Sequence, residues 1–243
     1  MLTSTHAGGV ATLTLARPDR GNALGPDLVE ALLAAVLAAG EDDTVHTLVL
    51  RGEGRHFCTG LDLSDLDQCR DGDLLQRLVR IETLLAAVWQ APMRTVALAQ
   101  GRTWGAGADL FAACEVRLAM ADATFRFPGA QFGIVLGTRR LAERVGADAA
   151  RAMTTTGGEW RAADAQAAGL VQQEVGDAAG IDDALDAACR TPAVDRLTAA
   201  ALRAASRIER ADQRDADLAA LVRSAARPGL VDRIRAYRAR LRA

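Results

Sequence analysis

The chain has 243 residues, half of them hydrophobic and a quarter charged, which is typical of a globular protein with one large core. Its formal net charge is −2, with both signs spread along the sequence, so a surface that binds nucleic acid is not expected. All 29 basic residues are arginine. Because lysine is absent, catalysis by a lysine Schiff base or a lysine general base is excluded.

The four cysteines (Cys58, Cys69, Cys114 and Cys189) form no CxxC pair and no zinc-ligand spacing with the histidines, so no metal site is expected. Scattered cysteines fit a reducing cytosol. The N-terminus lacks the pattern of a signal peptide, and no apolar run approaches the roughly 18 residues of a membrane span. We therefore expect a cytoplasmic protein without a membrane partner.

Strands and helices alternate along the first half of the sequence. Residues 10–16 alternate in hydrophobicity and end before Pro18, which predicts a strand, and Pro26 then opens a helix that Gly40 closes. The further elements that we predict are strands at 46–51, 95–99, 116–120 and 124–127 and helices at 73–90 and 107–113. This order predicts an α/β fold with repeated β-β-α units.

From about residue 181 onward the pattern predicts helices only, at 181–190, 193–210, 212–226 and 229–242. We therefore predict an α/β core over residues 1–188 and a C-terminal helical subdomain over residues 189–243. Apolar residues recur at helical spacing in the last helix and need a partner surface, which indicates self-association.

Two glycine-containing loops, each after a predicted strand, are the candidates for chemistry: His56 to Leu63, and Gly101 to Asp109. Glycine lets the backbone approach a ligand closely and leaves its N–H groups free to point outward. A helix that begins at the second loop adds the positive end of its dipole, which favours an oxyanion.

Four motifs in this order resemble the enoyl-CoA hydratase/isomerase (crotonase) family. They are Arg17-Pro18 with Asn22-Ala23-Leu24, Gly52 to Leu63, Gly101 to Gly107, and Ala165 to Val171, so the resemblance covers residues 10–175. It implies a crotonase-like spiral of β-β-α units and an acyl-CoA substrate. Coenzyme A is then part of the substrate, and no separate cofactor is expected.

The resemblance also implies roles for single residues. The backbone N–H groups of Leu61 and Ala106 correspond to the family's oxyanion hole, which stabilises the enolate of a thioester. Asp109 stands where the hydratases carry their first catalytic glutamate, and Gly129 stands where they carry the second. With one carboxylate, hydration by the usual pair is not expected, whereas moving a double bond needs a single base. Other candidates for the missing group are Gln131, Asp62, His56 and Glu159.

By the same resemblance, a further set of residues borders the path of the acyl-CoA. They are Arg20, Asn22, Ala23, Phe57, Cys58, Thr59, Gly60, Trp104, Gly105, Gly129 and Gln131. Helical tails of this kind imply a homotrimer or a dimer of trimers.

Three functions remain open at this point. The first is a lyase or isomerase that acts on an enoyl-CoA with Asp109 as its acid/base. The second is a different reaction of a CoA thioester, such as hydrolysis, decarboxylation or C–C cleavage. The third is acyl-CoA binding without catalysis.

Overall fold

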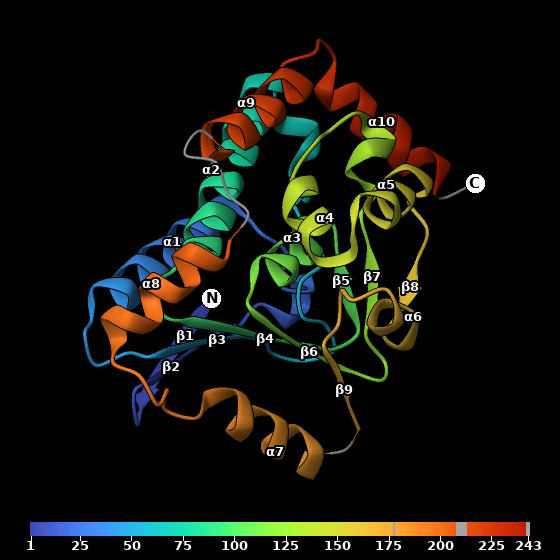
Figure 1. Ribbon diagram of the computed structural model, residues 1–243. Coiled ribbons are helices and arrows are strands. Elements are labelled where there is room, and N and C mark those ends of the chain that lie inside the picture. Colours follow the sequence, from blue (N-terminus) through green and yellow to red (C-terminus); the bar gives the residue numbers. More distant parts are fainter. Residues whose placement is uncertain (177, 208–212, 242–243) are drawn as a thin grey trace.

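Two sheets form the framework of the molecule in the computed structural model, which describes residues 1–176, 178–207 and 213–241 (Figure 1). The larger sheet has the order β1-β2-β3-β4-β6-β9: β1 (Leu2–Ala7), β2 (Val10–Leu15), β3 (Thr47–Gly52), β4 (Arg94–Ala99), β6 (Val116–Met120) and β9 (Gln173–Val175). Apart from the antiparallel pair β1–β2, its neighbours are parallel. The smaller sheet has the order β5-β7-β8: β5 (Arg102–Trp104), β7 (Thr124–Arg126) and β8 (Trp160–Arg161).

Both faces of the larger sheet are covered, as the side chains of β4 show. Val96 and Leu98 pack with α7 (Ala178–Cys189), whereas Ala97 and Ala99 belong to the main core on the opposite face. Successive side chains of a strand point to opposite faces, so a strand that is buried on both sides reads as a continuous apolar run. In Figure 1, α7 lies below the sheet while α1 (Pro26–Glu41), α2 (Asp71–Trp89) and α3 (Ala106–Ala113) lie above it.

The short helix α3 connects the two sheets. All eight of its residues are buried. Its Phe111 lies between Phe57, which follows β3, and Phe125 of β7, with ring centroids 6.3 and 4.9 Å away. Aromatic contacts of this kind add to the burial of a large apolar area. The start of α3 is therefore held firmly against both sheets.

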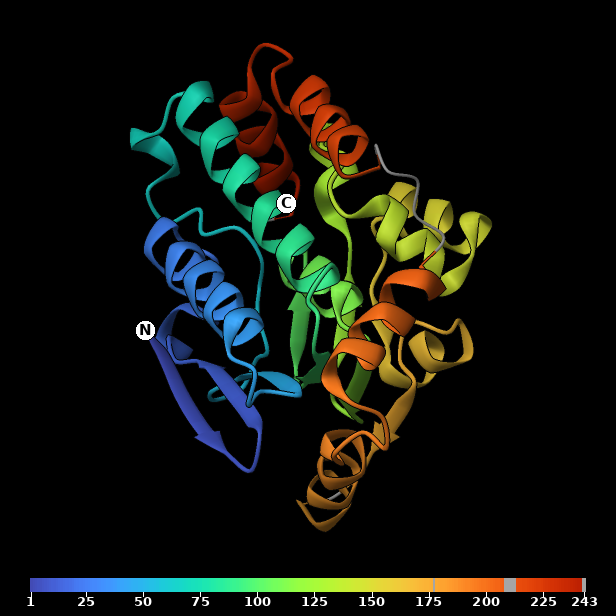
Figure 2. The same ribbon diagram turned by 60° about the vertical axis from the view of Figure 1, so that its left-hand side comes forward.

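The remaining helices surround this framework: α4 (Thr138–Val145), α5 (Ala147–Thr156), α6 (Ala162–Ala167), α8 (Arg196–Ser206), α9 (Gln213–Ala225) and α10 (Leu230–Arg240). A second apolar cluster joins α9 and α10 to α2, with Leu78, Leu221 and Ile234 among its buried members. Figure 2 shows α9 and α10 running beside α2. Among the described residues, no helix is both long and apolar enough to cross a membrane.

The α/β fold with two sheets and C-terminal helices confirms the prediction from sequence. The prediction was wrong in treating residues 101–107 as a loop, because Arg102–Trp104 form the strand β5 between two glycines. It also missed β1, and it placed the end of the 193–210 helix beyond Ser206. Residues 208–210, 212 and 242 of the expected helices lie outside the described residues, and the domain boundary at residue 188 stays a prediction.

The position of Phe111 leads to a stability prediction. Phe111→Ala removes a ring that is fully buried between two other rings, so we expect the free energy of unfolding to fall by about 3–5 kcal/mol. Urea titration followed by circular dichroism measures this change. As a control, Asp183→Ala at an exposed position of α7 should change it by less than about 0.5 kcal/mol. Equal losses in the two variants would contradict the role given to α3.

Candidate active site

The two glycine loops lie side by side because the segment after β3 pairs with β5. The N–H of Cys58 donates to the carbonyl of Arg102 at 3.3 Å, and the N–H of Trp104 donates to the carbonyl of Cys58 at 3.0 Å. This is a parallel register in which Cys58 faces Thr103. Two and three residues further along, it brings Gly60 beside Gly105 and Leu61 beside Ala106.

The close approach of the loops requires glycine. Gly60 has a φ of +94°, and a Cβ placed on it would lie 2.8 Å from the carbonyl oxygen of Trp104 and 3.3 Å from the amide nitrogen of Ala106. A Cβ on Gly107 would overlap the carbonyl oxygen of Cys58. Glycine is the residue that tolerates both a positive φ and such contact of backbone with backbone. The first turn of α3 therefore rests on the backbone of the first loop.

The amide of Leu61 is oriented by a second bridge. Leu24 donates its N–H to the carbonyl of Gly60 at 2.7 Å and accepts the N–H of Asp62 at 3.1 Å. In a parallel ladder, the residue opposite such a double contact points its own N–H and C=O to the other side. The N–H of Leu61 is thus turned away from Leu24.

The amide of Ala106 is free for a different reason. Ala106 is the first residue of α3, and the first N–H groups of a helix have no acceptor within it. Among the hydrogen bonds of residues 1–176, 178–207 and 213–241, neither the Leu61 nor the Ala106 amide is a donor. Two adjacent backbone donors therefore remain available at one place.

A cavity of about 630 Å³ opens beside these amides. Of the residues expected at the site, its walls contain Arg20, Ala23, Thr59, Gly60, Leu61, Trp104, Gly105, Ala106, Asp109 and Gly129. Its apolar wall is made of Leu63, Leu78, Phe132, Ile134, Leu136, Tyr237 and Leu241. Another cavity, of about 700 Å³, lies beneath α8 and away from both loops. We assign the site to the first because the free amides and the apolar wall meet there.

Four of the expected residues do not line the cavity. Phe57 and Cys58 are fully buried in the core. Burial raises the pKa of the Cys58 thiol to about 12, so it is no nucleophile. Gln131 donates its amide to the carbonyl of Thr155 at 2.7 Å. Asn22 is also fully buried.

The side chain of Asn22 holds the loops in place. Its amide donates to the carbonyls of Glu53 at 3.0 Å and His56 at 2.7 Å, and its oxygen accepts the N–H of Arg17 at 2.9 Å. The residue adopts a φ of +54°, which asparagine tolerates better than most residues do. Asn22 thus fastens the segment before α1 to the start of the first loop.

Trp104 and His56 have structural partners. The guanidinium groups of Arg102 and Arg126 lie 4.6 and 5.7 Å from the centre of the Trp104 ring, and the N–H of the ring donates to Thr124 at 3.1 Å. His56 accepts the N–H of Arg102 on Nδ1 at 3.0 Å. Burial and the nearby positive charge of Arg102 lower the pKa of His56, which keeps the ring neutral.

Asp109 lies in the first turn of α3 at the edge of the cavity and is only 6% exposed. Burial raises its pKa well above the usual range for a carboxyl, the carboxylate of Glu82 raises it further, and the guanidinium of Arg140 partly opposes both. Its Oδ1 lies against Gly137 and has no hydrogen-bond partner among the described residues. Burial therefore favours the protonated form of the Asp109 carboxyl.

Asp62 is the other carboxylate on the cavity wall, and it is already engaged. Burial acts to raise its pKa, but hydrogen bonds from Ser64 and the guanidinium of Arg17 outweigh that effect and hold the pKa below its usual range. The ion pair with Arg17 measures 3.2 Å. Asp62 therefore stays ionised and bound to its neighbours.

Gly129 carries no acid, yet the structure leaves room for a side chain there. It lies in the 3₁₀ helix Pro128–Phe132, and a Cβ on it would meet Ile134 at 3.5 to 3.9 Å, which is ordinary van der Waals contact. Sterics therefore do not require glycine at this position.

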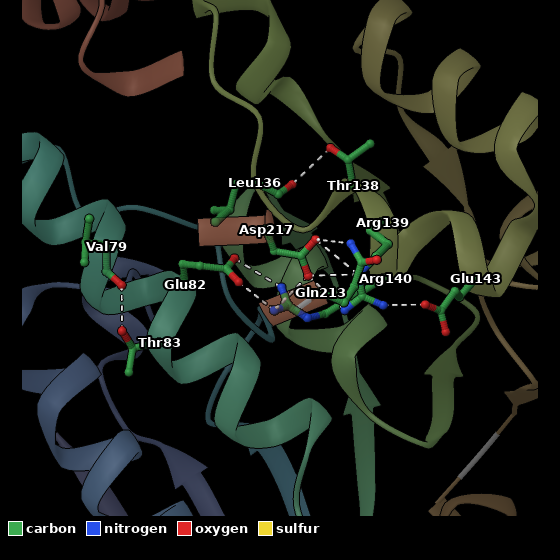
Figure 3. Close-up of polar contacts among 10 residues, drawn as sticks. All are labelled: Val79, Glu82, Thr83, Leu136, Thr138, Arg139, Arg140, Glu143, Gln213 and Asp217. Atoms are coloured by element: carbon green, nitrogen blue, oxygen red, sulfur yellow. Dashed lines mark hydrogen bonds and ion pairs between the residues drawn. The ribbon is translucent and has the colours of Figure 1, made fainter. Parts of the chain in front are cut away.

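One cluster of charged residues was missed by the sequence analysis (Figure 3). Arg140 of α4 donates to both carboxylate oxygens of Glu82 of α2, at 2.6 and 3.1 Å, and both side chains are almost fully buried. Asp217 of α9 pairs with Arg139 at 2.8 Å and with Arg140 at 3.6 Å. The available signal was Glu82 itself, since it interrupts the apolar stripe of its helix.

Comparison with known proteins shows the family of the chain. The sequence pattern of the enoyl-CoA hydratase/isomerase family matches residues 5–230, and the chain belongs to this family. The probable enoyl-CoA hydratase echA6 of Mycobacterium leprae is 38% identical over 162 residues, which is 64% of each chain. The match thus spans less than two thirds of that relative's length.

Solved structures extend the likeness to the whole fold. A crystal structure from Bordetella parapertussis, described as an enoyl-CoA hydratase/isomerase, has a TM-score of 0.90 at 45% identity over 97% of both chains. An enoyl-CoA hydratase/isomerase family protein from Silicibacter pomeroyi has a TM-score of 0.77 at 31% identity, covering 91% of this chain and 97% of that one. The crotonase-like fold predicted from the sequence is confirmed.

The role of Asn22 in holding the first loop can be tested by measuring the stability of variants. Asn22→Ala removes three hydrogen bonds and puts alanine at a positive φ, so the free energy of unfolding should fall by about 2–3 kcal/mol. Asn22→Gly loses the same bonds without the backbone strain and should cost less. Urea titration of both variants measures the difference. Unchanged stability in both variants would contradict the scaffold role.

Proposed function

We propose that the chain is an acyl-CoA enzyme in which the amides of Leu61 and Ala106 bind the carbonyl oxygen of a thioester. The observation that carries this proposal is the meeting of two free backbone donors at the wall of a largely apolar cavity. When a thioester becomes an enolate, the new negative charge resides on that oxygen. Two preorganised donors, with the N-terminus of α3 behind one of them, stabilise this charge, and a single donor contributes about 3–4 kcal/mol in comparable sites.

Asp109 is the group that we assign to proton transfer at the carbon next to the thioester. A carboxyl whose pKa is raised is a stronger base in its ionised form and still a competent acid in its protonated form, as a proton shuttle requires. The shift of a double bond between a 3-enoyl-CoA and a 2-enoyl-CoA needs one such group. In its carboxylate form it takes a proton from the carbon next to the thioester, and as the acid so formed it returns that proton to the far carbon of the original double bond. Addition of water by a pair of carboxylates is not favoured, because Asp62 is held by Arg17 and Gly129 has no side chain.

The cationic side chains at the cavity suit the phosphates of coenzyme A. Arg20, Arg126 and Arg238 belong to its lining, and guanidinium groups bind phosphate well. The apolar wall suits the acyl chain. Assembly into trimers, or pairs of trimers, is part of the proposal, and two exposed leucines on α8, Leu197 and Leu202, support it.

Binding of acyl-CoA without turnover is the second candidate function. It is favoured by two observations on the cavity wall. Asp109 is only 6% exposed, and Asp62, the other carboxylate among the described residues of this wall, is held in an ion pair with Arg17. A protein of this kind would bind CoA thioesters with the same affinity after Asp109 is replaced.

The first test replaces Asp109. With 3-enoyl-CoA as substrate, Asp109→Asn should lower kcat by about 10²–10⁴-fold with little change in KM, because the amide cannot exchange a proton while its shape is retained. The rise in absorbance of the conjugated product measures the rate. Glu159, another candidate from the sequence, is exposed and does not line the cavity, so Glu159→Gln is the control and should keep full activity. Full turnover by Asp109→Asn would contradict the assignment, and tight binding without turnover in the wild type would support the second candidate.

The second test restores the missing acid. Gly129→Glu should raise hydration of crotonyl-CoA by at least about tenfold, because a second carboxylate then reaches the cavity. Gly129→Ala, which fits the same space without an acid, should give no gain. Chromatography of the product, 3-hydroxyacyl-CoA, is the readout. The absence of this product in a correctly folded Gly129→Glu variant would count against the assigned place of Gly129.

A further inference from the structure

The charged cluster behind the active site is formed by Glu82, Arg140 and Asp217, which come from three different helices (Figure 3). Glu82 and Arg140 are 3% and 2% exposed, so their charges are poorly screened by water. A buried ion pair is weak evidence for stability, because removing two charges from water costs about as much as their attraction returns. The buried pair of Glu82 and Arg140 is therefore better explained by a function than by stability.

This cluster adjoins Asp109. The helix α3 packs against α2, which carries Glu82, and against α4, which carries Arg140. Two buried polar atoms in this region have no hydrogen-bond partner among the described residues, namely Asp109 Oδ1 and Arg140 Nε. The guanidinium of Arg140 therefore donates two N–H groups to Glu82, and its Nε–H has no acceptor among the described residues.

We propose that Glu82 is a positioning residue that occupies Arg140 and thereby leaves Asp109 uncharged and free to exchange its proton with a ligand. Glu82 and Asp109 are two carboxyls that compete for one buried guanidinium. The two-pronged contact of Arg140 with Glu82 decides that competition, since paired N–H···O bonds are among the strongest in proteins. The protonation of Asp109 can be measured without substrate, and only its use in catalysis rests on the proposed function.

The other charged groups near the site are accounted for. Asp217 approaches Arg140 from α9 at 3.6 Å and is bound mainly to Arg139. Arg102 of β5 stacks on Trp104. The remaining charged side chains of the cavity wall are Arg20, Asp62, Arg126 and Arg238. Burial and Glu82 both act to raise the pKa of Asp109, and Arg140 opposes them.

Because Glu82 and Arg140 act on the pKa of Asp109 in opposite directions, replacing one or both of them should give different titrations of Asp109. In Glu82→Gln the freed Arg140 should ionise Asp109, so the midpoint of its titration falls by at least about one unit, the size expected from an opposite charge close by. In the double variant Glu82→Gln/Arg140→Gln both charges are gone and burial alone remains, so Asp109 should again be protonated at neutral pH. Mere loosening of the fold would not produce such a reversal.

The experiment is infrared spectroscopy of the ligand-free protein across a pH range, following the C=O band of the protonated acid that is absent in Asp109→Asn. The band should persist at neutral pH in the wild type, vanish in Glu82→Gln and return in the double variant. Asp217→Asn is the matched control, since it breaks the same cluster on the side of α9, and should leave the midpoint nearly unchanged. An unchanged midpoint in Glu82→Gln, no return in the double variant, or an equal shift in Asp217→Asn would overturn the proposal.

If the isomerase reaction exists, its pH profile should move in step with the infrared midpoint in each variant. If the chain proves to bind acyl-CoA without turnover, the infrared pattern is expected all the same. The failure of the proposed function and the failure of this inference are therefore distinguishable.

Discussion

The contact between the first turn of α3 and the backbone of Cys58 to Gly60 is the constraint on which the site depends. It brings a backbone amide from each of two loops to one wall of the cavity, and it is possible because Gly60 and Gly107 carry no Cβ. The surrounding structure holds this arrangement through rigid parts: α3 is fixed between the sheets by Phe111, and Asn22 ties the first loop to the segment before α1. Backbone donors placed in this way need no rearrangement when charge develops.

The C-terminal helices complete the site from the other side. Tyr237 and Leu241 line the cavity, and the Tyr237 ring lies 5.3 Å from that of Phe132. Asp217 of α9 connects the same helical region to α4 through Arg139. The apolar wall and the charged cluster behind Asp109 therefore both depend on helices that follow residue 213, far in sequence from the glycine loops.

Much of this could be predicted from sequence because its signals are local. Glycine spacing in the two loops, Pro26 at a helix start and the alternation of β2 all reflect backbone geometry within a few residues. The strand β5 was missed because three residues between glycines give too short a pattern. Asn22 was assigned to ligand binding, whereas its side chain bonds backbone carbonyls 31 and 34 residues away. The pair of Glu82 and Arg140, 58 residues apart, exists only because α2 and α4 both pack against α3.

The most direct measurement is a crystal structure of the protein with an unreactive saturated acyl-CoA. The account predicts that the thioester oxygen lies about 2.7–3.1 Å from both the Leu61 and the Ala106 amide nitrogen, with the acyl chain against the apolar wall. A thioester oxygen that contacts neither amide, or an acyl-CoA bound in the cavity beneath α8, would contradict it.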